Sequence, residues 1–181
     1  MFLSIFILLY TYDTFSPGCR PNLILPADFI SVVEEIGLIN SLNEYVLREV
    51  FEKIASDWLG PPISVNISAK QFENNYHFLE HIEELTSRFN VLSKNIELEI
   101  TESALMEGIQ HNIAILAALH KMGFGFAIDD FGTGYSSFSY LPRIPADKVK
   151  IDRSFIQNLP ENKENALIVK SIINPHIPHQ V

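Results

Sequence analysis

The sequence predicts an α/β fold in which strands of a parallel sheet alternate with helices. Segments with period two, such as IELEIT at residues 96–101, have the pattern of strands. Segments with helical periodicity, such as residues 109–121, lie between them along the chain. The intervening helices are long enough for the crossover that joins two parallel strands. This order of elements is typical of βα units and of a parallel sheet.

The first regular elements are two helices. PADFISVVEEIG, residues 26–37, has Pro26 at its start and a glycine at its end, as helices often do. Ser41 and Glu44 match a capping box, which predicts that the second helix begins there. The following sequence, LNEYVLREVFEKIASDWL, carries an apolar stripe at helical spacing and continues this helix.

The rest of the chain alternates between strands and helices until Asn174. Ser68 and Gln71 form a second capping pair, which predicts a helix start directly after a strand. Gly123 ends the helix before the third strand. The predicted strands cover residues 63–68, 96–101, 124–129 and 148–152, and the last helix is ENALIVKSII at 164–173.

Composition limits the class of protein and its partners. With 181 residues, 47% of them hydrophobic and 19% charged, the chain fits one globular domain. The net charge of −9 offers no basic stripe for a DNA or RNA polymer. Cys19 is the single cysteine, which excludes a disulfide framework and a cysteine-based zinc site. A reducing compartment, and hence a cytoplasmic location, is the expectation.

The first ten residues, MFLSIFILLY, are apolar throughout. This run is too short to cross a bilayer as a helix, and it lacks the basic start of a signal peptide. Three interpretations stay open: a buried strand at residues 3–10, a membrane or secretory segment, and a stretch foreign to the domain that follows.

Polar side chains occur at the carboxyl end of every predicted strand. In repeated βα architectures these ends meet at one rim, where chemistry collects. Carboxylate and carboxamide oxygens are ligands suited to Mg²⁺, Mn²⁺ or Ca²⁺. The alternative is that these residues are ordinary turn formers and surface charges. In strand order they are Asn66, Glu99, the adjacent pair Asp129 and Asp130, and Lys150 with Asp152.

Several motifs resemble those of the EAL-type cyclic di-GMP phosphodiesterases, in the order of that family. They are PADFISVVEEIGLI, VNISAKQF, LEITESALME, AIDDFGTGYSSFSYL and KVKIDRSFI. The resemblance covers residues 23–173 and indicates a partial EAL domain. Residues 1–22 then form a divergent apolar segment, and residues 174–181 form a divergent tail.

The resemblance implies a TIM-like (β/α) barrel of the EAL type that hydrolyses cyclic di-GMP to linear pGpG with two Mg²⁺ or Mn²⁺ ions. Of the barrel's eight strands, the chain shows four or five. By motif, Asn66, Glu99, Asp129 and Asp130 resemble the metal ligands. Lys150, Asp130 and Asp152 resemble the catalytic residues, and Glu102 resembles the loop anchor. The substrate and dimer loop corresponds to Phe131, Gly132, Thr133, Gly134, Tyr135, Ser136 and Ser137.

The sequence also departs from the family. The Glu-Ala-Leu motif is absent before residue 26, and residues 1–20 contain no Glu. The Glu-Gly-Val-Glu strand, another source of ligands, is absent as well. We therefore expect a truncated EAL domain with little or no hydrolysis. One alternative is a degenerate EAL module that acts as a cyclic di-GMP receptor or interaction domain, with a homodimer or other signalling domains as partners. Another is an unrelated βα protein with a Ca²⁺ or Mg²⁺ site.

Overall fold

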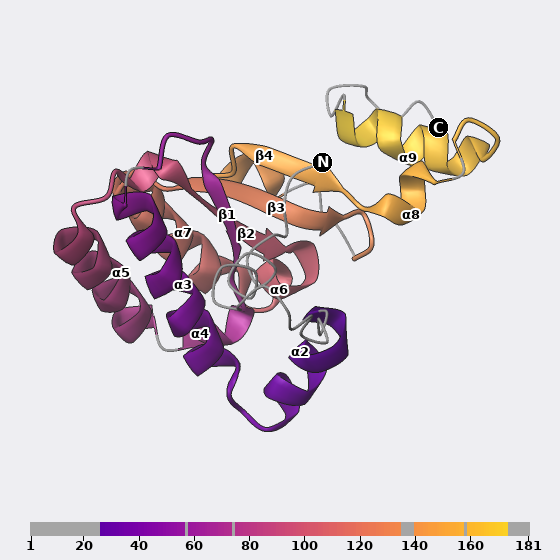
Figure 1. Cartoon of the computed structure of the whole chain (residues 1–181). Coiled ribbons are helices and arrows are strands. Elements are labelled where there is room, and N and C mark those ends of the chain that lie inside the picture. The colour runs from indigo at the N-terminus through magenta and orange to yellow at the C-terminus, as the bar shows by residue number, and fades with distance from the viewer. Residues whose placement is uncertain (1–25, 57, 74, 135–139, 158, 174–181) are drawn as a thin grey trace, which may run out of the picture.

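A computed structural model of the chain describes residues 26–173, except 57, 74, 135–139 and 158. Its centre is an open, four-stranded parallel sheet with the strand order β1-β2-β3-β4 (Figure 1). Each strand is followed along the chain by a helix or a loop that returns to the same end of the sheet. The strands are β1 Ile63–Asn66, β2 Ile96–Thr101, β3 Gly125–Phe131 and β4 Lys148–Ile151.

Helices cover one face of this sheet. The three longest, α3, α5 and α7, run beside one another, with α3 against β1 and α5 between the other two (Figure 1). At the carboxyl-terminal side of the sheet, α8 follows β4 directly, and α9 lies beyond it, away from the strands. The helices are α2 Pro26–Glu35, α3 Ile39–Ala55, α4 Ala69–Glu73, α5 Asn75–Phe89, α6 Glu102–Met106, α7 Ile109–Lys121, α8 Arg153–Ile156 and α9 Lys163–Ile173, with short 3-10 turns at Ser93–Asn95 and Leu141–Arg143.

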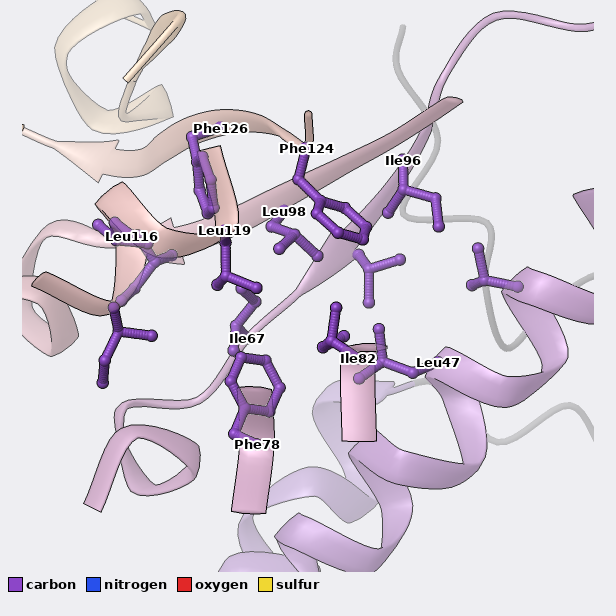
Figure 2. Packing of buried hydrophobic residues seen from close by; sticks show 14 of the residues in the cluster. Leu47, Ile67, Phe78, Ile82, Ile96, Leu98, Leu116, Leu119, Phe124 and Phe126 are labelled. Carbon is purple, nitrogen blue, oxygen red and sulfur yellow. The ribbon is translucent and has the colours of Figure 1, made fainter. Parts of the chain in front are cut away.

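The register of the strands separates an apolar face from a polar face. Leu98 pairs with Phe126 and both are almost completely buried. Because neighbouring residues in register point to the same side of a sheet, this row belongs to the apolar face. Figure 2 shows how this face meets the helices: Leu98 and Phe126 lie near Leu119 of α7, while Ile82 of α5 and Leu47 of α3 close the core from the other side.

Most predicted elements are confirmed. Several bounds differ by one or two residues, as in β1, which ends at Asn66 instead of residue 68, and two differences have an identifiable physical cause. The helix α3 begins at Ile39, and its start has no side-chain cap, so the predicted capping box at Ser41 and Glu44 is wrong. The reason is that Ile39 is buried and packing extends the helix past the polar signal. The second capping pair is confirmed, since the Ser68 amide donates to Gln71 Oε1 at 3.0 Å.

The second difference concerns β3. The alternation predicted a strand that stops at Asp129, whereas β3 continues to Phe131. Phe131 is buried and pairs with Ile151 of β4, which carries the strand past the two aspartates. The predicted strand at residues 3–10 and the tail from residue 174 lie outside the described residues. Within the part of the chain that is described, no helix is long and apolar enough to span a membrane.

Candidate functional site

The polar face of the sheet carries two parallel rows of opposite charge. Glu97 and Glu99 alternate along β2, and Lys148 and Lys150 alternate along β4. Lys148 Nζ lies 2.5 Å from Glu97 Oε2, and the Lys150 ammonium pairs with Glu99 Oε1. Two buried carboxylates on one face are therefore each matched by a cation, as burial of charge requires.

Small residues on β3 allow these ion pairs to form across a whole strand. β3 lies between β2 and β4 and presents Gly125 opposite Glu97 and Ala127 opposite Glu99. With no long side chain in between, the lysines of β4 can reach the glutamates of β2. Ala127 is completely buried, which is consistent with side chains that lie over it. Lys148 and Glu97 are not among the predicted site residues, although the alternation in KVK and ELE was the signal for the pairing.

The aspartate pair lies in a β-bulge. Ile128 pairs with Val149 and Phe131 pairs with Ile151, so Asp129 and Asp130 together stand opposite Lys150 alone. Asp130 has a φ of 52°, in the left-handed region that aspartate tolerates better than most residues. In a regular strand, consecutive side chains point to opposite faces. The bulge breaks this rule locally, which keeps the second carboxylate out of the apolar core.

Lys150 connects the first aspartate to the buried glutamate. Its Nζ lies 3.9 Å from Asp129 Oδ2, in addition to its ion pair with Glu99. The Glu99 side chain is 4% exposed and the Lys150 side chain 33%. The Lys150 ammonium is therefore the cation that compensates the buried Glu99 carboxylate. The three side chains form one cluster of two negative charges and one positive charge.

Asp130 and Asp152 form a second, more exposed carboxylate pair. Partial burial raises the pKa of Asp130, the charges of Asp129 and Asp152 raise it further, and Lys150 opposes them. The pKa of Asp152 is lowered, mainly by hydrogen bonds from the Ser154 hydroxyl and amide, because Asp152 caps α8. The two carboxyls thus differ in proton affinity, and Asp130 is the one that holds a proton more readily.

Glu102 holds the start of the loop that follows the bulge. Its buried carboxylate accepts the amide of Gly132 at 2.7 Å and the amide of Gly134 at 3.4 Å. The adjacent Thr133 donates its hydroxyl to the carbonyl of Asp130 at 2.8 Å. The first half of the predicted loop is therefore fixed to the end of β2. The predicted loop residues Tyr135, Ser136 and Ser137 lie outside the described residues.

Asn66 stands at the exposed end of β1. It pairs in register with Glu99 and so lies on the polar face, two strands away from Asp129. The structure therefore brings Glu99, Asp129 and Lys150 together directly, places Asp130 beside Asp152, and leaves Asn66 at the margin of the same face.

The predicted metal ligands lie on one face of the sheet but are not gathered around one point. Hard cations prefer oxygen donors, which the side chains of Asn66, Glu99, Asp129 and Asp130 all contain, but the Glu99 side chain is only 4% exposed. Glu99 and Asp129 already share one cationic group, the Lys150 ammonium. Among the described residues, however, no three His, Cys, Asp or Glu side chains lie close enough together to hold a metal ion.

Comparisons with known proteins show the family to which the chain belongs. The family model described as EAL domain matches residues 18–178. The bifunctional diguanylate cyclase/cyclic di-GMP phosphodiesterase MucR of Pseudomonas aeruginosa is 38% identical over 159 residues, which are 84% of this chain and 23% of MucR. The cyclic di-GMP phosphodiesterase PdeB of Shewanella oneidensis is 34% identical over 154 residues, 83% of this chain and 18% of PdeB. The chain thus spans less than a quarter of either relative.

A solved structure is similar over most of the described fold. The structure described as "PaMucR Phosphodiesterase, c-di-GMP complex" superposes with a TM-score of 0.77 at 38% identity. The match covers 83% of this chain and 67% of that chain. The four-stranded sheet with its helices is therefore the same arrangement as part of an EAL barrel.

Proposed function

Because the chain belongs to the EAL domain family, we propose that the polar face of its sheet is a cyclic di-GMP site of the phosphodiesterase type. The observation that carries this proposal is the cluster of Glu99, Asp129 and Lys150 beside the bulge of β3. It sets a cation and carboxylates at one end of a parallel sheet, where a phosphodiester has to meet both positive charge and a base.

Each residue of the cluster has a role in this proposal. Lys150, oriented by Glu99, donates to a phosphate oxygen of the bound dinucleotide. Asp130 and Asp152, whose carboxyls interact, are the catalytic carboxyls beside it. Glu102 orders Gly132 and Gly134, at the start of the loop that follows the bulge. Asn66, Glu99, Asp129 and Asp130 would hold a divalent ion, Mg²⁺ or Mn²⁺. Such an ion lowers the pKa of a bound water and neutralises charge on the phosphate.

A second candidate function is binding of cyclic di-GMP without hydrolysis. Two observations favour it. The charge of Glu99 is already neutralised by Lys150. Among the described residues, no group of three His, Cys, Asp or Glu side chains could hold a metal ion. A dinucleotide phosphate can still bind Lys150 under these conditions, but water would not be activated. We propose that the 181-residue chain hydrolyses slowly for this reason, and that it acts in the cytoplasm, consistent with its single cysteine.

Calorimetry and product analysis on the whole chain separate the two functions. Cyclic di-GMP is titrated into the protein with EDTA and with Mn²⁺, and the same samples are assayed for linear pGpG by chromatography. Phosphodiesterase function predicts Mn²⁺-dependent product formation that Asp129→Asn removes. Receptor function predicts binding in EDTA, no product, and at least tenfold weaker binding for Lys150→Met.

Glu84→Gln is a matched control, because Glu84 is an exposed acid on α5, far from the polar face. It should leave both binding and turnover as they are in the parent chain. Absence of binding and of turnover under all conditions would overturn both candidate functions.

A further inference from the structure

We propose that Glu97 is a positioning residue of the site: by holding the Lys148 ammonium, it keeps Lys150 on Glu99 instead of on Asp129. Glu97 thereby decides which carboxylate at the end of the sheet keeps its negative charge. The importance of this for the reaction rests on the proposed function. The ion pairs themselves do not depend on it.

Neither lysine of β4 pairs with the carboxylate that the register places beside it. Lys148 stands opposite Ala127, and Ala127 stands opposite Glu99. Lys148 nevertheless forms its ion pair with Glu97, two residues earlier on β2. Lys150 stands opposite the bulge of β3 and pairs with Glu99. Both lysines therefore reach toward the start of β2, an arrangement that we call the staggered pairing.

The same side chains allow a second arrangement, the lateral pairing. In it, Lys148 takes Glu99, and Lys150 takes Asp129 of the bulge opposite it. Lys150 Nζ already lies 3.9 Å from Asp129 Oδ2, so a small movement of the ammonium completes its part of the exchange. Two ammonium groups are shared by three carboxylates in either case. The lateral pairing deprives Glu97 of its cation, whereas the staggered pairing leaves Asp129 with the more distant contact.

Burial selects the staggered pairing. The side chains of Glu97 and Glu99 are 10% and 4% exposed, and that of Asp129 is 30% exposed. A carboxylate without a close cation costs more free energy the more completely it is buried. The staggered pairing gives the two cations to the two most buried carboxylates of the three. The excess negative charge then lies on Asp129, the one that belongs to the proposed site.

Ser64 and Gly125 help Glu97 to hold Lys148. The Ser64 hydroxyl donates to Glu97 Oε1 at 3.3 Å, while Lys148 Nζ donates to Glu97 Oε2 at 2.5 Å. Gly125 of β3 stands opposite Glu97, so no β3 side chain separates this carboxylate from β4 at that level. Both oxygens of Glu97 are thus engaged, and its ion pair keeps Lys148 away from Glu99.

Removal of the charge of Glu97 removes the reason for the staggered pairing. In Glu97→Gln, two lysines meet two carboxylates, and the lateral pairing leaves neither carboxylate without a cation. Lys148 then turns to Glu99, and Lys150 moves to Asp129. The negative charge that the staggered pairing leaves at the site is lost.

A double-mutant cycle shows which carboxylate Lys150 holds. Its coupling with Asp129 is obtained from urea unfolding, in EDTA, of Lys150→Met, Asp129→Asn and their combination. In the Glu97→Gln background, we expect this coupling, as a factor in the unfolding equilibrium constant, to be at least about threefold larger than in the parent chain. In the background of Glu97→Gln with Lys148→Met, no second lysine competes for Glu99. The coupling should then return to its value in the parent chain.

Glu84→Gln is the matched control background, because it removes a carboxylate from an exposed position on α5 and should leave the coupling unchanged. Glu97→Met is a second variant, which removes the charge without leaving a polar group, and it should raise the coupling as Glu97→Gln does. Circular dichroism verifies that each background is folded. An unchanged coupling in the Glu97 variants would overturn the proposal, as would an increase that Lys148→Met does not reverse.

Formation of linear pGpG gives a second readout. With Mn²⁺, it should fall at least about threefold in Glu97→Gln and recover when Lys148→Met is added, because Lys150 returns to Glu99. A merely structural role of Glu97 predicts no recovery, since its buried carboxylate is still absent from the double variant. A parent chain that forms no pGpG would overturn phosphodiesterase function. The unfolding cycles would still decide whether Glu97 controls the pairing.

Discussion

The ion pair between Lys150 and Glu99 makes a strong prediction about stability. In Lys150→Met, the Glu99 carboxylate keeps its place at 4% exposure but loses the ammonium that neutralises it. Methionine preserves most of the aliphatic stem, so the packing over β3 changes little. The predicted loss in the free energy of unfolding is thus the consequence of an uncompensated buried charge.

The expected magnitude follows from the exposure of the two partners. Removing one partner of a fully buried pair costs about 3–5 kcal/mol. The Lys150 side chain is 33% exposed, so water screens part of the interaction. We therefore expect a loss of about 2–3 kcal/mol. Lys148→Met is the internal comparison: that lysine is 57% exposed, and its removal should cost less than about 1 kcal/mol.

The assay is urea unfolding of four proteins in the presence of EDTA: the parent chain, Lys150→Met, Glu99→Gln and the double variant. If the buried charge is the cause, Glu99→Gln should restore most of the stability that Lys150→Met loses, because an amide needs no cation. Two results would refute the reasoning. One is a loss no larger than that of Lys148→Met, and the other is a double variant as unstable as Lys150→Met.

Three further predictions concern the bulge and its loop. Gly132→Ala should lower the midpoint of thermal unfolding more than Gly108→Ala does. Both glycines have a positive φ, so both changes strain the backbone. A Cβ at Gly132 would also lie 2.8 Å from the Phe155 ring, whereas nothing lies within 4 Å of a Cβ at Gly108. The raised pKa of Asp130 means that the folded state binds its proton more tightly than the unfolded state, so its contribution to stability falls as pH rises above 3.8. Asp130→Asn should therefore stabilise the protein more at pH 7 than at pH 3, by urea unfolding, and an equal gain at both pH values would contradict this. Lys150→Met should bind Mn²⁺ more tightly than the parent chain in calorimetry, because the ammonium no longer occupies the carboxylates; unchanged affinity would show that they do not bind the ion.

Most helices and strands could be predicted from the periodicity of their apolar residues, because the apolar face of each element packs into the hydrophobic core. β2 begins and ends where IELEIT predicts, since its three apolar residues lie on the apolar face, while its two glutamates are buried on the opposite face with the lysines of β4. The bulge could not be predicted in this way. It adds one residue to β3, and only the partner strand, through the pairing of Phe131 with Ile151, shows that the strand continues. The start of α3 was missed because the burial of Ile39 is a tertiary effect.

The candidate site was predicted in its residues but not in its contacts. The sequence placed Glu99, Asp129 and Lys150 at the ends of three strands, and strand order brings them together. The alternation in ELE and KVK indicated that lysines could compensate the glutamates. The reach of the Lys150 side chain could not be predicted, because it depends on the small size of Ala127 on the strand between. The contact of Asp130 with Asp152 likewise depends on the left-handed backbone at the bulge.

The bulge places one more residue in β3 than its pairing with β4 requires. With Asp130 deleted, Asp129 would face Lys150 one to one, Phe131 would keep its partner Ile151, and the ladder between the two strands would run without interruption. In such a shortened chain, the pairing between β3 and β4 would be more regular, and this end of the sheet would be more rigid. It would also lose the carboxyl group that interacts with Asp152, so a regular backbone and this pair of carboxyls exclude each other.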